Sequence, residues 1–182
     1  EKYRDPYTVL SYYNENAAEK DLIQSAFIVM DYTGTVQAVV GGLGEKPGDG
    51  AFNRATQATR SPGSTMKPIS TYSLAVQKNL ITYSTLIPDE AINIGTHDEP
   101  QIWPQNYGEV WGDGTLRTAW YGVQHSLNTL AVRVGRMNTT KAMYTQLTQM
   151  LGFTTLVESD IALSPLCLGA LTRSEEHTSE LQ

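Results

Sequence analysis

A serine and a lysine three residues apart are the side chains in this sequence best suited to covalent chemistry. Ser64 and Lys67 lie in the run SPGSTMKP. In a helix this spacing puts both side chains on one face, one turn apart, so the amine can reach the hydroxyl. A neutral lysine amine can accept the proton of a serine hydroxyl, which then attacks a carbonyl carbon. The run predicts a serine nucleophile with its own lysine base.

The residues around Ser64 favour a position at or near the start of a helix. Gly63 permits a sharp turn before it, and helix-compatible residues run from Ile69 to Asn79. Free backbone N–H groups at a helix start stabilise an oxyanion. Because only a neutral lysine is a base, Lys67 must have its pKa lowered by burial or by nearby positive charge.

A second short motif strengthens this interpretation. Ser-x-x-Lys alone also fits a surface helix in which Ser64 caps the first turn and Lys67 is solvated. The sequence contains one Ser-x-x-Lys and one Ser-x-Asn, the latter formed by Ser126 and Asn128, which begins 62 positions after Ser64 (126 − 64). The two motifs together favour a catalytic role for Ser64 and Lys67 over a solvated surface helix.

The pair of motifs resembles the transpeptidase domain of class A penicillin-binding proteins, the bifunctional enzymes that build peptidoglycan. The resemblance extends from about residue 24 to residue 172. Its segments are QSAFIVMDYTGTVQAVVGG (24–42), FNRATQATRSPGSTMKP (52–68), IWPQNYG (102–108), LRTAWYGVQHSLNTLAVRVG (116–135) and LSPLCLGALT (163–172). It implies an α+β fold of the penicillin-binding transpeptidase and serine β-lactamase type, an antiparallel sheet with a helical subdomain, here partial and lacking its late strands.

The resemblance also implies roles for the motif residues. Ser64 would attack the penultimate D-alanine of a stem peptide and release the terminal D-alanine. Lys67 would take the Ser64 proton, Ser126 would relay a proton to the leaving amine, and Asn128 would orient Lys67 and bind the substrate amide. An amine of a second stem peptide would then resolve the ester, and a β-lactam would acylate Ser64 and remain attached.

The loop after residue 101 is expected to line the cleft. In the resembling family it contributes a wall, so we expect Trp103, Asn106 and Tyr107 to bind substrate. Among Trp103, Tyr107, Trp111 and Trp120 we expect at least two to pack into the core instead. No metal and no cofactor is implied. The expected partners are peptidoglycan stem peptides and β-lactam antibiotics, at the extracytoplasmic face of the bacterial membrane, with the anchor and a glycosyltransferase domain in an upstream region.

The expected domain organisation has three parts. Residues 1–23 would link to the upstream domain, residues 24–172 would form a truncated transpeptidase domain, and residues 173–182 (RSEEHTSELQ) would be an artefactual tail. The tail back-translates into a common sequencing adapter. The family's third motif, Lys-Thr-Gly or a variant, occurs nowhere in the 182 residues. Because that motif supplies an oxyanion-hole amide, we expect the truncated domain to be inactive.

Two other functions remain open on these residues. One is a β-lactamase or β-lactam sensor on the same scaffold, although no glutamate is followed four residues later by the asparagine of a Glu-x-x-x-Asn loop. The other is a non-catalytic peptidoglycan-binding module, which the missing third motif favours. A metal at His97–Glu99 and a triad through His125 are disfavoured, because adjacent side chains rarely converge on one point.

Composition agrees with a folded protein that binds no nucleic acid. The 182 residues are 40% hydrophobic and carry a net charge of −6, with lysine and arginine scattered. No segment approaches the roughly 20 apolar residues that cross a bilayer. The single cysteine, Cys167, lies in an apolar run and is expected in the core.

Turn residues and periodicity predict the secondary structure. The expected elements are a hairpin of 25–32 and 35–40 around Thr33-Gly34, a loop over 41–50, a helix over 65–79 after Ser64, an irregular stretch over 81–114, helices over 116–126 and 130–136, and a helix over 139–151 with Gly152 as its stop.

Overall fold

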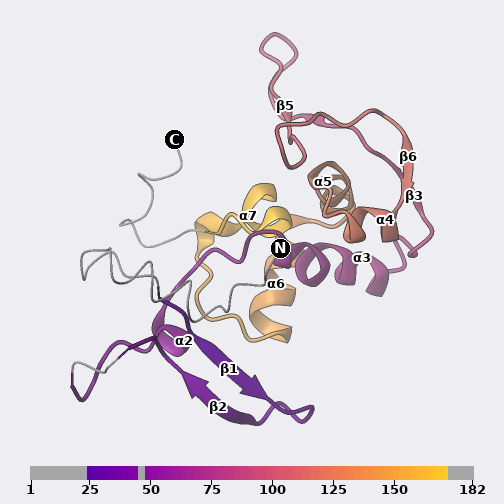
Figure 1. Cartoon of the computed structure of the whole chain (residues 1–182). Coiled ribbons are helices and arrows are strands. Elements are labelled where there is room, and N and C mark those ends of the chain that lie inside the picture. Colours follow the sequence, from indigo (N-terminus) through magenta and orange to yellow (C-terminus); the bar gives the residue numbers. More distant parts are fainter. Residues whose placement is uncertain (1–23, 45–47, 172–182) are drawn as a thin grey trace, which may run out of the picture. The chain divides into compact units, whose positions relative to one another are not determined.

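The computed structural model of the chain describes residues 24–44 and 48–171 (Figure 1). The chain divides into two compact units between Ala58 and Thr59. The expected linker over 1–23 and the expected tail over 173–182 lie outside the described residues. None of the described helices is both long and apolar enough to cross a membrane.

The first unit contains the predicted hairpin. Strand β1 (Phe27–Met30) pairs antiparallel with β2 (Val36–Val40). Asp31 builds the turn, because its carboxylate accepts hydrogen bonds from the backbone N–H groups of Thr33 and Thr35 at 2.9 and 3.0 Å. The hairpin prediction is confirmed. The unit also holds a short helix, α2 (Arg54–Gln57), which was not predicted.

The second unit begins with the helix predicted after Ser64. It has three parts, η2 (Gly63–Thr65), η3 (Lys67–Tyr72) and α3 (Ser73–Gln77). The middle part is π-helical, since the N–H of Ser73 donates to the carbonyl of Pro68, five residues earlier. The helix is therefore confirmed, whereas its wider middle turn was not foreseen.

The helix predicted over 116–126 is partly wrong. Residues Leu116–Thr118 form strand β6, which pairs antiparallel with β3 (Leu86–Pro88). Helix α4 (Ala119–Gln124) begins only after Thr118, whose hydroxyl accepts the N–H of Tyr121 at 3.1 Å. The pairing with a strand 30 residues earlier overrides the local helical pattern. Helix α5 (Asn128–Met137) covers the other predicted segment.

The remaining predicted helix, over 139–151, is confirmed. Thr139 caps it by accepting the N–H of Ala142 at 3.2 Å, and Gly152 follows it with φ 71°. The expected irregular stretch holds three short strands. The elements not yet named are α6 (Thr140–Thr145), η4 (Gln146–Met150), η5 (Glu158–Asp160), α7 (Leu163–Leu168), β4 (Ile92–Asn93) and β5 (Ile102–Trp103), the last two paired antiparallel.

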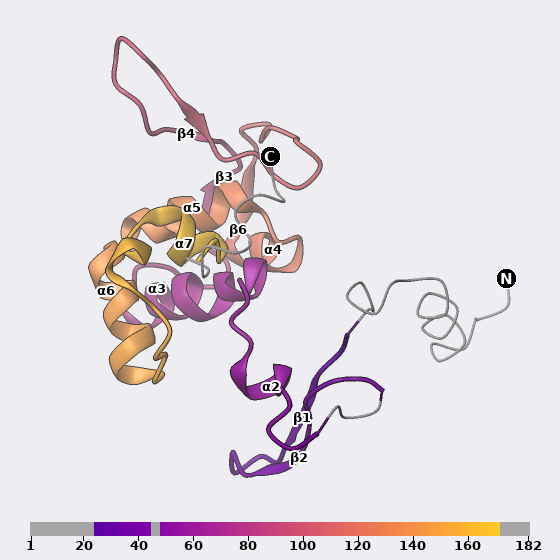
Figure 2. The ribbon, with the colours of Figure 1, turned by 90° about the vertical axis from the view of Figure 1, so that its left-hand side faces the viewer.

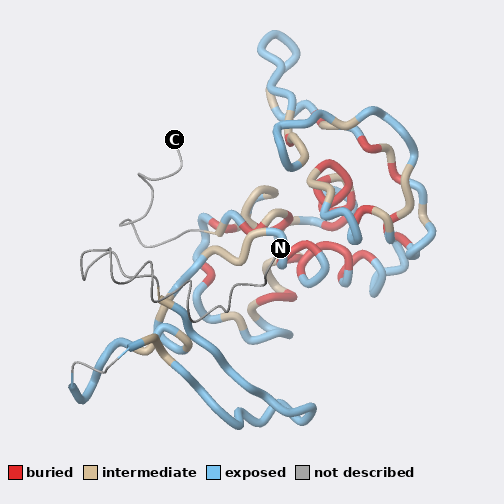
Figure 3. Tube along the Cα trace, in the orientation of Figure 1, coloured by how far each residue is buried: buried red, intermediate tan, exposed pale blue. Residues whose placement is uncertain are grey.

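Helix α5 lies at the centre of the second unit. It contacts η3, α4 and α7, and most of its residues are buried (Figures 2 and 3). Gly135 on α5 touches Cys167 on α7 so closely that a Cβ there would overlap the sulfur. Cys167 is fully buried, which confirms its expected place in the core, and burial raises the pKa of its thiol to about 11. Helices and small antiparallel sheets together form an α+β unit around this helix.

Candidate active site

The side chain of Lys67 is buried where η3 meets the start of α5. Only 2% of the residue is exposed. Its Nζ donates to the carbonyl of Ser126 at 2.6 Å, to Ser126 Oγ at 3.1 Å and to Asn128 Oδ1 at 2.5 Å. The expectation that Ser126 and Asn128 meet Lys67 is confirmed, so Lys67 and both residues of the second motif form one polar cluster.

Burial disfavours the charged form of Lys67. Its three partners are uncharged acceptors, and it forms no ion pair with any described residue. Burial lowers its pKa from 10.5 to about 8. At pH 7 a pKa of about 8 leaves roughly a tenth of the amines neutral, a fraction large enough for a base.

Ser126 reaches Lys67 through an unusual backbone conformation. It follows α4 and has φ 52°, in the left-handed region that non-glycine residues rarely adopt. The N–H of Leu127 donates back to the carbonyl of Gly122 at 2.9 Å, which closes the turn between α4 and α5. This turn presents both the carbonyl and the hydroxyl of Ser126 to the amine. Such strain is common where a structure holds functional groups.

Ser64 lies in η2 and is exposed. Gly63 before it has φ 55°, and its N–H donates to the carbonyl of Gly169 at 3.3 Å. Ser61 Oγ donates to the same carbonyl. The end of α7 therefore fixes the segment that carries Ser64. The Ser64 hydroxyl itself forms no hydrogen bond with any described residue, so the structure does not join it to Lys67.

The three expected substrate contacts differ in exposure. Trp103 is half-buried and packs against the core, whereas Tyr107 is 97% exposed. The side chain of Asn106 accepts hydrogen bonds from the backbone N–H groups at the start of α5. Trp111 and Trp120 are about half exposed. The expectation that at least two of these aromatic residues pack into the core is therefore wrong, because only Trp103 does so.

The disfavoured alternatives gain nothing from the geometry. The ring of His125 stacks on Tyr121 with centroids 4.0 Å apart, rather than bonding to Ser126. Residues 97–99 lie in an exposed loop. Within the described ranges no three side chains of histidine, cysteine, aspartate or glutamate gather as a metal site.

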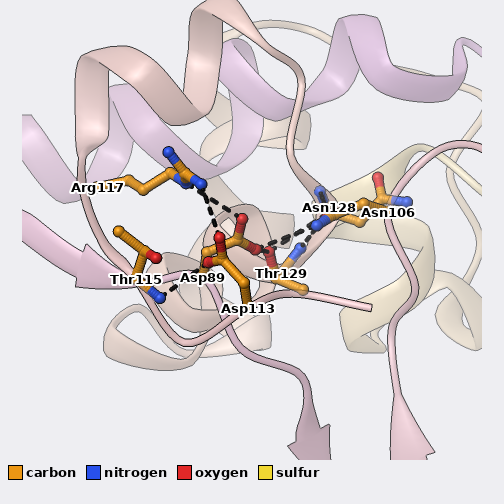
Figure 4. A network of polar contacts seen from close by, with 7 residues as sticks. All are labelled: Asp89, Asn106, Asp113, Thr115, Arg117, Asn128 and Thr129. Atoms are coloured by element: carbon orange, nitrogen blue, oxygen red, sulfur yellow. Dashed lines mark hydrogen bonds and ion pairs between the residues drawn. The ribbon is translucent and has the colours of Figure 1, made fainter. Parts of the chain in front are cut away.

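Sequence reasoning missed the polar network behind Asn128 (Figure 4). Asp89 is 6% exposed, and its Oδ1 accepts from Thr129 Oγ1 at 2.6 Å and from Asn106 Nδ2 at 3.1 Å. Asp89 belongs to the stretch expected to be irregular, where no motif or periodicity marks it. A buried aspartate must have hydrogen-bond partners, but the sequence shows neither that Asp89 is buried nor which residues those partners are.

Comparisons with known proteins agree with the geometry. Residues 24–162 match the family model of the penicillin binding protein transpeptidase domain. The chain is 40% identical over 120 residues to penicillin-binding protein 1A of Neisseria lactamica, covering 64% of this chain and 14% of that protein. It is 36% identical over 134 residues to penicillin-binding protein 1A of Aquifex aeolicus, covering 70% and 17%.

A solved structure supports the same conclusion. The crystal structure of penicillin-binding protein 1A from Haemophilus influenzae matches with a TM-score of 0.57 and 25% identity, covering 74% of this chain and 19% of that one. The chain thus spans less than a fifth of the relatives it matches. Its fold is a partial α+β transpeptidase fold, and the chain belongs to the penicillin-binding protein transpeptidase family.

Proposed function

We propose that this site is the acyl-serine centre of a peptidoglycan D,D-transpeptidase that β-lactams also acylate. One observation carries the proposal. The Lys67 amine is buried among three neutral acceptors, two from Ser126 and one from Asn128. A buried lysine without a carboxylate partner costs stability, and a lowered pKa suits it to act as a base.

The proposed reaction proceeds by two acyl transfers. Lys67 Nζ accepts the Ser64 proton while Ser64 Oγ bonds to the carbonyl carbon of the penultimate D-alanine. The peptide C–N bond then breaks, and the proton passes through Ser126 Oγ to the departing amine of the terminal D-alanine. Ser126 Oγ lies 3.1 Å from Lys67 Nζ, within reach for this relay. An amine of a second stem peptide attacks the ester and restores the Ser64 hydroxyl.

A β-lactam follows only the first half of this sequence. The ring C–N bond opens when Ser64 attacks, and the ring nitrogen takes the proton. The amine stays tethered to the acyl group, so it blocks the second attack and the adduct persists.

We propose that the activity belongs to the longer protein that carries this segment. The third motif is absent from the 182 residues, and the relatives are at least five times longer than the matched region. Removing one oxyanion-hole donor costs about a hundredfold or more in rate. Stem peptides would be the substrates, with the protein anchored at the extracytoplasmic face of the membrane.

Labelling with a fluorescent penicillin tests the proposal. In the longest natural protein that carries residues 24–171, we expect a stable adduct that Ser64→Ala abolishes and the matched exposed Ser84→Ala keeps. Lys67→Met should slow labelling about a thousandfold, since general-base catalysis contributes about 10²–10⁴, and exposed Lys78→Met should not. An adduct of normal yield in Ser64→Ala would contradict the proposal.

A non-catalytic peptidoglycan-binding module is the second candidate. The missing third motif favours it for the 182 residues alone. Such a module would sediment with purified peptidoglycan and form no adduct in any variant. A β-lactamase would instead form an adduct that decays by hydrolysis within minutes.

A further inference from the structure

Helix α5 receives its N-terminal cap from a distant loop. The residue before it is Leu127, whose side chain offers no acceptor. The first N–H groups of a helix have no partner within the helix. Asn106, 22 residues earlier in the chain, supplies the missing acceptor. Its Oδ1 accepts hydrogen bonds from the N–H groups of Asn128 at 2.8 Å and Thr129 at 3.2 Å.

The same loop fixes the orientation of the Asn128 amide. Asn128 Nδ2 donates to the carbonyl of Gln105 at 2.7 Å. A carbonyl oxygen only accepts, so it holds the NH₂ end of the amide and leaves Oδ1 on the other side. Asn128 Oδ1 is thereby directed at Lys67 Nζ, 2.5 Å away. A rotated amide would present N–H groups to the lysine amine and repel its charged form.

Asp89 fixes the position of the loop that carries Gln105 and Asn106 (Figure 4). Its Oδ1 binds both Asn106 Nδ2 and Thr129 Oγ1, so one buried carboxylate joins the loop to α5. Its Oδ2 lies 3.4 Å from Arg117 Nε on β6. The backbone of Asp89 is tied to the loop before β6, since its N–H donates to the Thr115 carbonyl and its carbonyl accepts from Gly114.

We propose that Asn106 and Asp89 are positioning residues that hold Asn128, and through it Lys67, ready for proton transfer. The inference rests on the proposed function, and it gives Asn106 a role other than the substrate contact expected from the sequence. Both polar ends of the Asn106 side chain are occupied within the protein. Asn106 and Asp89 act through Asn128 and touch neither Lys67 nor Ser64.

The chain offers a matched control for Asn106. Asn93 also accepts two backbone N–H groups through Oδ1, from Gly95 and Gln101 at 2.9 Å each. It is the last residue of β4 and forms no hydrogen bond with Lys67, Ser126 or Asn128. Asn93→Ala therefore removes the same chemical group and the same kind of contact without reaching the site.

Acylation kinetics of the longest natural protein test the inference. We expect Asn106→Ala to lower the first-order acylation rate by about 10- to 100-fold, because a displaced base slows proton transfer steeply. The dissociation constant of the preceding penicillin complex should change much less than the acylation rate, because both polar ends of the Asn106 side chain are bonded within the protein. Asn93→Ala should alter neither.

An exchange of the two side chains separates positioning from general damage. Asn106→Asp alone places a second carboxylate beside that of Asp89, and the two repel each other. Its acylation should be as slow as that of Asn106→Ala. The double variant Asn106→Asp with Asp89→Asn restores an amide donor facing a carboxylate, and the carboxylate still accepts the α5 N–H groups. We expect the double variant to recover to within about fivefold of the natural rate.

The failures of the two proposals are distinguishable. Natural acylation in Asn106→Ala, or equal losses in Asn93→Ala, would overturn the inference while leaving the acyl-serine centre intact. If the unsubstituted protein forms no adduct, the proposed function fails, and amide hydrogen exchange decides the inference. Unchanged exchange at Asn128 and Thr129 together with an unchanged Lys67 pKa in Asn106→Ala would then overturn it.

Discussion

The two units of the chain form regular elements by similar local rules but bury them very differently (Figure 3). In the hairpin, Phe27 and Met30 are 64% and 59% exposed, and no strand residue is buried. In the helical unit, Leu130 and Val132 on α5 are fully buried. Turn chemistry alone can define a hairpin, whereas lowering the pKa of a lysine amine requires a core that excludes water. The site accordingly lies at the start of α5, a helix with most of its residues buried.

Amide hydrogen exchange gives the sharpest form of this comparison. Exchange from a buried helix requires extensive unfolding, whereas an isolated two-stranded hairpin opens readily. We expect the amides of Leu130 to Val134 to exchange at least about a thousandfold more slowly than those of Val36 to Val40. Equal protection would show that the hairpin is packed against something and would remove the contrast.

Cavity-forming substitutions should separate the two units in stability. Leu130→Ala removes a fully buried side chain and should cost about 2–5 kcal/mol of unfolding free energy. Val29→Ala in the hairpin removes a side chain that is 41% exposed and should cost less than about 1 kcal/mol. Chemical denaturation measures both. Equal losses would mean that the hairpin shares the core.

Gly169→Ala should damage the contact that holds the Ser64 segment. Gly169 has φ 74°, and a Cβ there would overlap the backbone of Gly63. Gly152 has a similar φ of 71° but open space around it, so Gly152→Ala measures backbone strain alone. We expect Gly169→Ala to cost about 1–3 kcal/mol more than Gly152→Ala, the usual cost of overpacking. Equal costs in denaturation would contradict the tight contact.

The buried lysine should leave a smaller signature in the pH dependence of stability. The pKa of Lys67 is about 8 in the folded chain and 10.5 in the unfolded chain. Between these values the unfolded chain binds more protons, so stability rises with pH from about 8 to 10.5 and the cost of burying the charge is present in full below this window. Lys67→Met should remove this rise, whereas Lys78→Met should keep it. Melting temperatures across this range measure the effect.

Sequence reasoning predicted the local parts of this structure well. Thr33-Gly34 marked the hairpin turn, and Gly152 marked the end of one helix, because each acts through its own neighbours. The meeting of Lys67 with Asn128 is a long-range contact, and it was foreseen only because two motifs of a known family occur together. Their proposed roles stay predictions.

The errors have a common cause in long-range pairing. Leu116 to Thr118 form a strand because β3 lies beside them, and no local pattern reveals a partner 30 residues away. Asp89 and Asn106 were missed as a pair for the same reason. Exposure of the aromatic residues at 107, 111 and 120 depends on which surfaces the fold covers. Spacing along the chain carries none of this information.

The pH dependence of Ser64 acylation by a fluorescent penicillin tests the central claim most directly. If the buried Lys67 amine is the base, the acylation rate should rise with pH and level off with an apparent pKa of about 8, and Lys67→Met should lose this dependence along with most of the rate. A rate that is flat between pH 6 and 9, or that persists unchanged in Lys67→Met, would contradict the account.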